Sequence, residues 1–251
     1  MSQLQAVFWD VDGTLADTEM SGHRVAYNRA FAELGVDWNW DPALYAELLT
    51  IPGGTKRMQR FAEMSSVSLT PDLLQRLREA KQRHYLALIR SGAVQWRPGV
   101  LRLLKDLQQA GVQQWIVTSS GLASVQALLE VLNGFSAGPF CGWVTADDVR
   151  CSKPDPEPYL LALRRSGVDP DCAIALEDSA PGLRSARAAG LPCLLTPSPW
   201  DSALPMENHH ATAVLDHFGA ETSCRIFSGP PCEGGRVTLK YLEMLLDLGQ
   251  G

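Results

Sequence analysis

Several features that mark particular classes of protein are missing from this sequence of 251 residues. No segment approaches the roughly 18 uninterrupted apolar residues of a transmembrane helix, so we expect no membrane partner. The start of the chain has neither a basic stretch nor an apolar signal core before its first β-like segment, which favours a cytoplasmic location. The six cysteines show no C-x-x-C spacing, and we therefore interpret them as reduced thiols that serve mainly in packing.

Positive charge is also scarce. The chain has 22 Lys and Arg against 28 Asp and Glu, which gives a net charge of −6 and a pI near 5.4. This balance argues against non-specific binding to nucleic acid or to an anionic membrane. Any site that handles phosphate must therefore collect its own lysine, arginine or metal ion. The length and the apolar content of 45% do allow a large core domain with a smaller inserted one.

Short apolar runs alternate with helical patterns through most of the chain. The runs are Ala6–Trp9, Gln114–Thr118, Gly142–Thr145, Ala173–Leu176, Cys193–Thr196 and Ala213–Leu215. Strands that alternate with helices at this spacing are typical of a parallel sheet covered on both faces. We therefore predict an α/β fold with a doubly wound parallel sheet.

One region interrupts this alternation. Residues 17–96 contain no convincing strand, and their apolar spacing predicts helices over 19–34, 43–49, 56–64 and 72–90. We predict that 17–96 form a helical cap domain, and that 1–16 and 97–251 form the α/β core. An insert that leaves and re-enters at strand ends is well placed to act as a lid. Near the C-terminus, Ser223–Arg236 is expected to be a surface loop and Val237–Leu248 a helix.

The first predicted strand ends in two acidic residues, Asp10 and Asp12, followed by Gly13 and Thr14. A buried strand cannot easily end in two unpaired negative charges, and a divalent cation would offset them. Carboxylate and main-chain carbonyl oxygens suit Mg²⁺, and a carboxylate can also attack phosphorus to form an aspartyl-phosphate. Taken alone, the same residues would fit an ordinary turn or helix cap.

Polar residues also follow other predicted strands. Thr118 and Ser119 come at a strand-to-helix turn, Lys153 lies in a loop with three prolines, and Glu177-Asp178 form a second acidic pair. Each has an ordinary explanation alone, as a helix cap, a solvated lysine or a strand end. Together they bring acids, a hydroxyl and a cation to one edge of a sheet, which predicts a site for phosphate and metal.

These residues resemble the four motifs of the haloacid dehalogenase-like superfamily. The matching stretches are Asp10-x-Asp12-Gly13-Thr14, Thr118, Lys153-Pro154 and Glu177-Asp178. Two longer patterns are similar to the branch of β-phosphoglucomutase and phosphoglycolate phosphatase, namely Ser152-Lys153-Pro154-x-Pro156-x-x-Tyr159 and Glu177-Asp178-Ser179-x-x-Gly182. Within that branch, the cap stretches Asp17–Asn28 and Gly53–Met58 resemble the CbbY-like sugar-bisphosphate phosphatases.

The resemblance implies a division of roles. Asp10 would be the nucleophile, and Asp12 would protonate the leaving oxygen and then activate water. Lys153, Thr118 and Ser119 would bind the phosphoryl group. Mg²⁺ would be held by Asp10, the main-chain carbonyl of Asp12 and Asp178, with Glu177 either a further ligand or the partner of a metal-bound water. The cap residues expected to contact substrate are Glu19, His23, Lys56, Arg57 and Lys81.

The spacing of these cap residues supports their role in binding substrate. Glu19 and His23 are four residues apart and would share one face of a helix. Lys56 and Arg57 follow the Gly53-Gly54 corner, from which they could reach a second phosphate.

The function implied is hydrolysis of a small phosphorylated sugar such as xylulose-1,5-bisphosphate, by a monomer or small homo-oligomer. A phosphosugar mutase of the β-phosphoglucomutase type or a phosphoglycolate phosphatase would use the same catalytic residues, so both stay open. A dehalogenase is disfavoured because that pattern lacks an equivalent of Asp12. A phospho-accepting receiver domain is disfavoured because receivers are short and have no inserted cap.

Overall fold

The computed structural model describes residues 3–51, 53–65, 67–131, 138–198 and 210–249. It divides into two compact units: Thr18–Gln95 form one, and the chain before and after them forms the other. No helix within the described ranges is both long and apolar enough to cross a membrane.

The α/β unit, formed by the chain before Thr18 and after Gln95, contains a sheet of seven strands in the order β5-β4-β1-β6-β7-β8-β9, counted over the described residues. The strands are β1 (Ala6–Trp9), β4 (Gln113–Val117), β5 (Gly142–Val144), β6 (Ala173–Glu177), β7 (Cys193–Leu195), β8 (Ala213–Leu215) and β9 (Ile226–Ser228). The pairs from β5 to β8 are parallel, and β9 pairs antiparallel with β8. The predicted parallel α/β sheet is confirmed.

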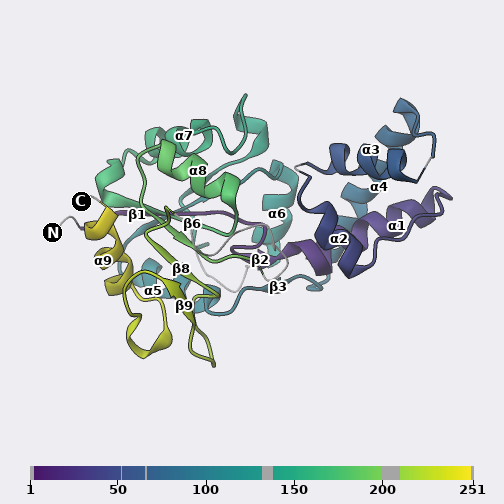
Figure 1. Cartoon of the computed structure of the whole chain (residues 1–251). Coiled ribbons are helices and arrows are strands. Elements are labelled where there is room, and N and C mark those ends of the chain that lie inside the picture. The colour runs from purple at the N-terminus through teal and green to yellow at the C-terminus, as the bar shows by residue number, and fades with distance from the viewer. Residues whose placement is uncertain (1–2, 52, 66, 132–137, 199–209, 250–251) are drawn as a thin grey trace. The chain divides into compact units, whose positions relative to one another are not determined.

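Helices cover both faces of this sheet. Figure 1 shows α7 and α8 on one face and α5 and α9 on the other. The helical segments of the unit are α5 (Val100–Gln109), α6 (Leu122–Val131), η2 (Ala146–Asp148), α7 (Glu157–Ser166), η3 (Pro170–Cys172), α8 (Ala180–Ala188), η4 (Glu233–Gly235) and α9 (Leu239–Gly249). Side chains of β1 alternate between the faces: Phe8 belongs to the core beneath α7 and α8, whereas Trp9 packs edge-to-face on Phe218 at 5.5 Å.

The strand register places the chemistry of the unit at one edge. Trp9, the last residue of β1, pairs with Ile116 of β4 and with Leu176 of β6. Parallel strands that end at the same level release their following residues at the same edge. The acidic residues after β1 and β6 and the threonine after β4 therefore leave the sheet side by side.

The second unit is helical. It consists of η1 (Glu19–Arg24), α1 (Val25–Glu33), α2 (Pro42–Leu48), α3 (Gly54–Met64) and α4 (Pro71–Arg90). Its core is aromatic: Trp40 is fully buried and meets Phe31 edge-to-face at 5.0 Å. The short strands β2 (Ala16–Asp17) and β3 (Gln95–Trp96) pair where the chain enters and leaves the unit.

Two local predictions need correction. The segment 19–34 is not one regular α-helix, because η1 is a π-helix that precedes α1. The segment Ser223–Arg236 is not simply a surface loop, because it contains β9 and two buried cysteines, Cys224 and Cys232. The amide of Cys224 donates to the carbonyl of Gly235, so the segment closes on itself and shields both thiols. All six cysteines are free, as predicted.

Candidate active site

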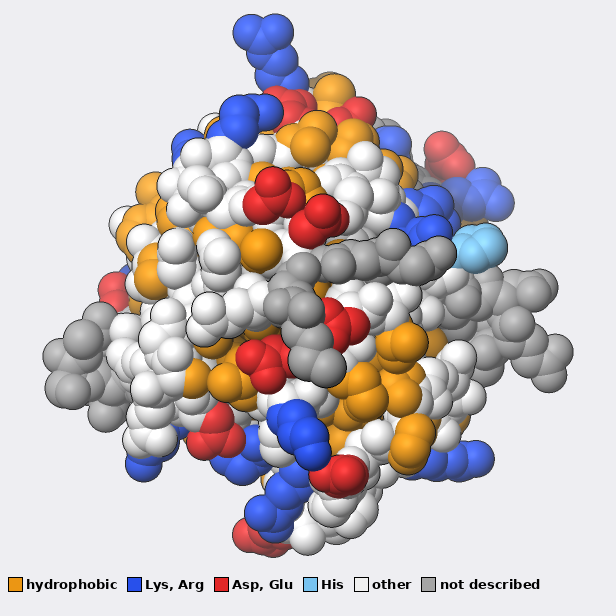
Figure 2. Space-filling view, turned by 90° about the vertical axis from the view of Figure 1, so that its left-hand side faces the viewer, with side chains coloured by type: hydrophobic (Ala, Val, Ile, Leu, Met, Phe, Trp, Pro, Cys, Tyr) orange, Lys and Arg blue, Asp and Glu red, His pale blue; other side chains and the backbone are white. Residues whose placement is uncertain are grey.

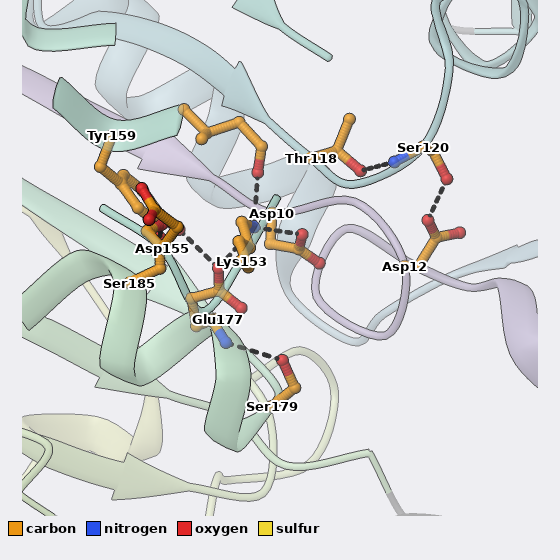
Figure 3. A network of polar contacts seen from close by, with 12 residues as sticks. Asp10, Asp12, Thr118, Ser120, Lys153, Asp155, Tyr159, Glu177, Ser179 and Ser185 are labelled. Carbon is orange, nitrogen blue, oxygen red and sulfur yellow. Dashed lines mark hydrogen bonds and ion pairs between the residues drawn. The ribbon is translucent and has the colours of Figure 1, made fainter. Parts of the chain in front are cut away.

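Lys153 links three strands at the carboxyl edge of the sheet. Its ammonium nitrogen donates to Oδ1 of Asp10 at 2.7 Å, to Oε1 of Glu177 at 2.6 Å and to the carbonyl of Val117 at 2.7 Å (Figure 3). An ammonium group has three protons, and these three contacts use all of them. The side chain is only 4% exposed, so the pairs lie away from solvent. Asp10, 143 positions from Lys153 in the sequence, and Glu177, 24 positions from it, thus bind the same nitrogen.

Three carboxylates, two of which contact this lysine, lie close together at this edge of the sheet. Asp10, Glu177 and Asp178 are buried, and one oxygen from each lies within 4.8 Å of the others. Burial raises the pKa of Asp10 to about 7, and the nearby charges of Glu177 and Asp12 add to that effect, while Lys153 opposes it. Three acids against one lysine leave an excess of negative charge that a divalent cation would balance.

The donor set fits such a cation. All three side chains offer hard oxygen ligands of the kind that Mg²⁺ and Ca²⁺ prefer. Oε2 of Glu177 is buried and has no hydrogen-bond partner among the described residues, an arrangement that is costly unless a ligand completes it. These acids could therefore hold a metal ion.

Gly13 makes room for one of these acids. Its φ of +88° lies in the left-handed region, and a Cβ atom there would come within 2.0 Å of Oδ2 of Asp178. Glycine therefore permits both the tight turn after β1 and the close approach of Asp178 to the backbone of the Asp12–Gly13 turn.

Asp12 is held by the turn that follows β4. Its Oδ2 accepts a hydrogen bond from Oγ of Ser120 at 2.5 Å, and Figure 3 shows the carboxylate pointing toward that serine. The backbone amide of Ser120 in turn donates to Oγ1 of the buried Thr118 at 3.0 Å. The Asp12 side chain thus lies outside the three-acid group, and its predicted metal ligand, the main-chain carbonyl, remains a prediction. Ser119 is exposed at the same turn.

Two further residues were not predicted as part of the site. Ser120 lay in a recognised turn, but no pattern singled it out from Ser119. The sequence did not single out Arg97, yet it is buried and donates to the carbonyls of Thr196, Pro197 and Asp216. Burial lowers the pKa of Arg97, and the charge of Asp178 opposes that shift. Arg97 thus joins the loops that follow β7 and β8 and adds positive charge near Asp178.

In the helical unit, Glu19 and Arg57 belong to one network. The hydroxyl of Tyr45 donates to Oε2 of Glu19 at 2.6 Å, and Nη1 of Arg57 donates to the same hydroxyl at 3.1 Å. Nε of Arg57 donates to the carbonyl of Leu48 at 3.0 Å, and the residue is 8% exposed. Three N–H groups of Arg57 thus bond inside the unit and support Tyr45 and Glu19, and its predicted contact with substrate stays a prediction.

His23 and Lys81 form a second pair in this unit. Lys81 Nζ lies 2.8 Å from Nδ1 of His23, and because an ammonium group can only donate, this nitrogen must be the acceptor. The imidazole stacks on Tyr85 with ring centroids 4.1 Å apart. Glu19 is contacted by Tyr45 of α2, whereas His23 is contacted by Lys81 of α4. Lys56 is exposed on α3.

Charges elsewhere on the surface are mixed. On the face drawn in Figure 2, Lys and Arg side chains are interspersed with Asp and Glu. This distribution is in keeping with the net charge of −6. The acids of the site face two buried cations, Lys153 beside Asp10 and Glu177 and Arg97 near Asp178.

Comparisons with known proteins agree with this geometry. Residues 4–190 match the sequence profile of the haloacid dehalogenase-like hydrolases. The chain is 41% identical over 195 residues to the protein CbbY of Cereibacter sphaeroides, which covers 77% of this chain and 84% of that protein.

Two solved structures are also similar. One is CbbY from Rhodobacter sphaeroides in complex with phosphate, with a TM-score of 0.76, 38% identity and coverage of 86% of this chain and 95% of that one. The other is a variant of the same protein in complex with xylulose-(1,5)bisphosphate, with a TM-score of 0.75, 36% identity and the same coverage. The similarity extends over most of the chain rather than over isolated motifs.

Proposed function

This chain belongs to the haloacid dehalogenase-like hydrolases and is a phosphatase, and on that basis we propose that it is a Mg²⁺-dependent sugar-bisphosphate phosphatase. The observation that supports this most strongly is the environment of Asp10. A carboxylate at the end of β1 is paired with Lys153 and lies beside two more buried acids. Such a group is suited to bind the cation and phosphate that together balance its charges.

In this proposal Asp10 attacks the phosphorus and becomes an aspartyl-phosphate, which water then hydrolyses. Lys153 stabilises the transferred phosphoryl oxygens, and Thr118 and the main-chain amide of Ser119 bind them at the adjacent turn. Mg²⁺ would be held by Asp10, Glu177, Asp178 and the carbonyl of Asp12, and would supply further positive charge for the phosphoryl group.

Asp12 is proposed to move the proton. It would protonate the leaving sugar oxygen and later accept a proton from the attacking water. Its hydrogen bond with Ser120 supports this role, since it orients the carboxylate independently of the Lys153 network. Ser120 thus binds Asp12, whereas Lys153 binds Asp10, so the two aspartates have different partners for proton transfer and for attack.

We propose that residues 17–96 act as the cap and supply specificity. Glu19 would accept hydrogen bonds from sugar hydroxyls, His23 would contact the sugar, and Lys81 and Lys56 would bind a second phosphate. The bisphosphate preference rests on the similarity to CbbY, whose variant is known in complex with xylulose-(1,5)bisphosphate. The cationic Lys81 and exposed Lys56 are chemically suited to a second phosphate.

The proposal is tested by measuring phosphate release from xylulose-1,5-bisphosphate, glucose 1,6-bisphosphate, phosphoglycolate and an aryl phosphate. We expect continuous turnover with Mg²⁺, a kcat/KM highest for xylulose-1,5-bisphosphate, and loss of turnover in EDTA. A preference for phosphoglycolate would contradict the substrate. Isomerisation of a sugar monophosphate that requires a bisphosphate primer would instead identify a mutase. Turnover unaffected by EDTA would contradict the metal.

A further inference from the structure

One oxygen of Glu177 receives two strong hydrogen bonds. Oε1 accepts from Lys153 Nζ at 2.6 Å and from the hydroxyl of Tyr159 at 2.5 Å (Figure 3). Both donors come from the segment that follows β5, since Lys153 precedes α7 and Tyr159 lies on it. An oxygen with two such donors has little capacity left for a further ligand.

Tyr159 is itself fixed in place. It is completely buried, its ring lies 6.4 Å from that of Phe8, and Lys153 Nζ lies 5.2 Å from its ring centre. A tyrosine hydroxyl is protonated at neutral pH, so the phenol donates its proton to Glu177 Oε1. The hydroxyl is therefore a permanent partner for Glu177 Oε1.

The Glu177 carboxylate also packs against a glycine. A Cβ atom on Gly182 would lie 1.8 Å from Oε2 of Glu177, 2.1 Å from its carboxyl carbon and 2.4 Å from Oε1. Any side chain at this position in α8 would therefore push the carboxylate away. Ser179 begins this helix by accepting a hydrogen bond from the amide of Gly182 at 3.3 Å, which holds the first turn in place.

We propose that Tyr159 and Gly182 are positioning residues of the metal site, which fix the Glu177 carboxylate so that Oε2 is left for the cation or for water bound to it. Oε2 is the oxygen that has no hydrogen-bond partner within the described chain. Tyr159 and Gly182 act through Glu177 and need not touch substrate. The inference rests on the proposed function in one respect, that the three-acid group binds Mg²⁺.

The test is Tyr159→Phe, which removes the hydroxyl and keeps the ring. Partners that orient a metal ligand typically contribute 10- to 100-fold in metal affinity, so we expect Mg²⁺ to bind about 10-fold more weakly. Isothermal titration calorimetry on EDTA-stripped protein measures this directly. The Mg²⁺ concentration for half-maximal turnover should rise by the same factor, while KM for the sugar bisphosphate at saturating Mg²⁺ stays the same.

Tyr241→Phe is the matched control. Tyr241 is also buried in the α/β unit, and its hydroxyl donates to the carbonyl of Pro230 at 3.0 Å rather than to an acid. This variant should bind Mg²⁺ as tightly as the wild type. A loss of affinity that follows from general loosening of the unit would appear in both variants and would overturn the inference.

Gly182→Ala is the second variant, and it should weaken Mg²⁺ binding more than Tyr159→Phe because its methyl group displaces the carboxylate. If this variant does not fold, Tyr159→Phe decides alone. Unchanged Mg²⁺ affinity in Tyr159→Phe, with tight binding in the wild type, would overturn the inference and leave the proposed function standing. A wild-type protein that binds no Mg²⁺ would overturn both.

Discussion

The two units each contain buried charged side chains, but the groups differ in their balance of charge. In the α/β unit, Lys153 faces Asp10 and Glu177, with Asp178 close by. In the helical unit, Arg57 is bonded to Tyr45, which donates to Glu19. The first group has more acids than cations, whereas the second pairs one cation with one acid through a phenol.

The pKa shifts reflect this difference. Burial raises the pKa of Asp10 to about 7, which shows that Lys153 does not compensate the cost of ionising it. Burial alone would lower the pKa of Arg57, but Tyr45 and Glu19 raise it overall, so the arginine charge is well supported. The difference indicates that a buried group with an excess of acids points to a missing cation, whereas a group with matched charges needs no ion.

The largest effect is expected from removing the central acid. Asp10→Asn keeps the shape of the side chain but removes the nucleophile, and we expect phosphate release to fall by at least about 10⁴-fold. A discontinuous assay with Mg²⁺ and a sugar bisphosphate measures it, and circular dichroism checks the fold. Hydrolysis near the wild-type rate would exclude Asp10 as the nucleophile.

The second prediction concerns pH and the metal. Because the pKa of Asp10 is about 7, the metal-free protein carries a proton there at lower pH, and Mg²⁺ must displace it. The affinity for Mg²⁺ should therefore fall as pH drops below 7, approaching about 10-fold per pH unit for one proton. Calorimetric titrations at pH 6, 7 and 8 measure the slope, and equal affinities at pH 6 and 8 would contradict it.

Protonation of Asp10 should also change the stability of the metal-free protein, which gives an independent check of its pKa. In the folded protein the pKa of Asp10 is about 7, above its ordinary value of 3.8. Asp10 therefore makes its full contribution to the free energy of unfolding below pH 3.8, and this contribution is lost as the pH rises through about 7. Metal-free Asp10→Asn should therefore melt at a higher temperature than metal-free wild type at pH 8. The difference should shrink toward pH 4, and added Mg²⁺ should reduce it at pH 8.

The third prediction concerns the network of Arg57, Tyr45 and Glu19 in the helical unit. Arg57→Met leaves the Tyr45 hydroxyl and the Leu48 carbonyl without their donor, and we expect a loss of about 2–3 kcal/mol in the free energy of unfolding. Urea denaturation measures this loss. Wild-type stability combined with a selective loss of bisphosphate turnover would contradict this structural role and support the predicted contact of Arg57 with substrate.

The smallest effect on stability is expected at the neighbouring residue. Lys56 is exposed, so Lys56→Ala should change the free energy of unfolding by no more than about 0.5 kcal/mol. If Lys56 binds a second phosphate, KM should rise several-fold for the bisphosphate and stay constant for an aryl phosphate. An equal rise for both substrates would exclude that contact and leave Lys81 as the candidate.

Much of the fold followed from local patterns. The strands Ala6–Trp9 and Ala213–Leu215 agree with prediction at both ends, because apolar runs bounded by polar residues have few alternatives in a buried parallel sheet. Strand β9 was missed because Ile226–Ser228 is short and lies partly exposed at the edge of the sheet. A segment of this kind has no apolar pattern strong enough to separate it from a loop.

The contacts of the candidate site were likewise predictable only in part. Asp10, Lys153 and Glu177 were predicted to meet, because each follows or flanks a strand whose end could be located, and the structure brings them together. The contact of Arg97 with Asp216, 119 residues away, was not predictable from the spacing of residue types. The sequence also could not predict that Arg57 is buried while Lys56 is exposed, because two adjacent basic residues give no signal that distinguishes them.

The order of residue types along the chain was thus enough to predict a parallel sheet, a helical insert and an edge rich in acids, because hydrophobic periodicity and strand ends are local properties. Only the folded chain decided which oxygen of Glu177 is already occupied, which serine holds Asp12 and which cap cation is buried. Those outcomes depend on distances between groups far apart in sequence and on the low polarity of the interior, where each unpaired charge must find a partner.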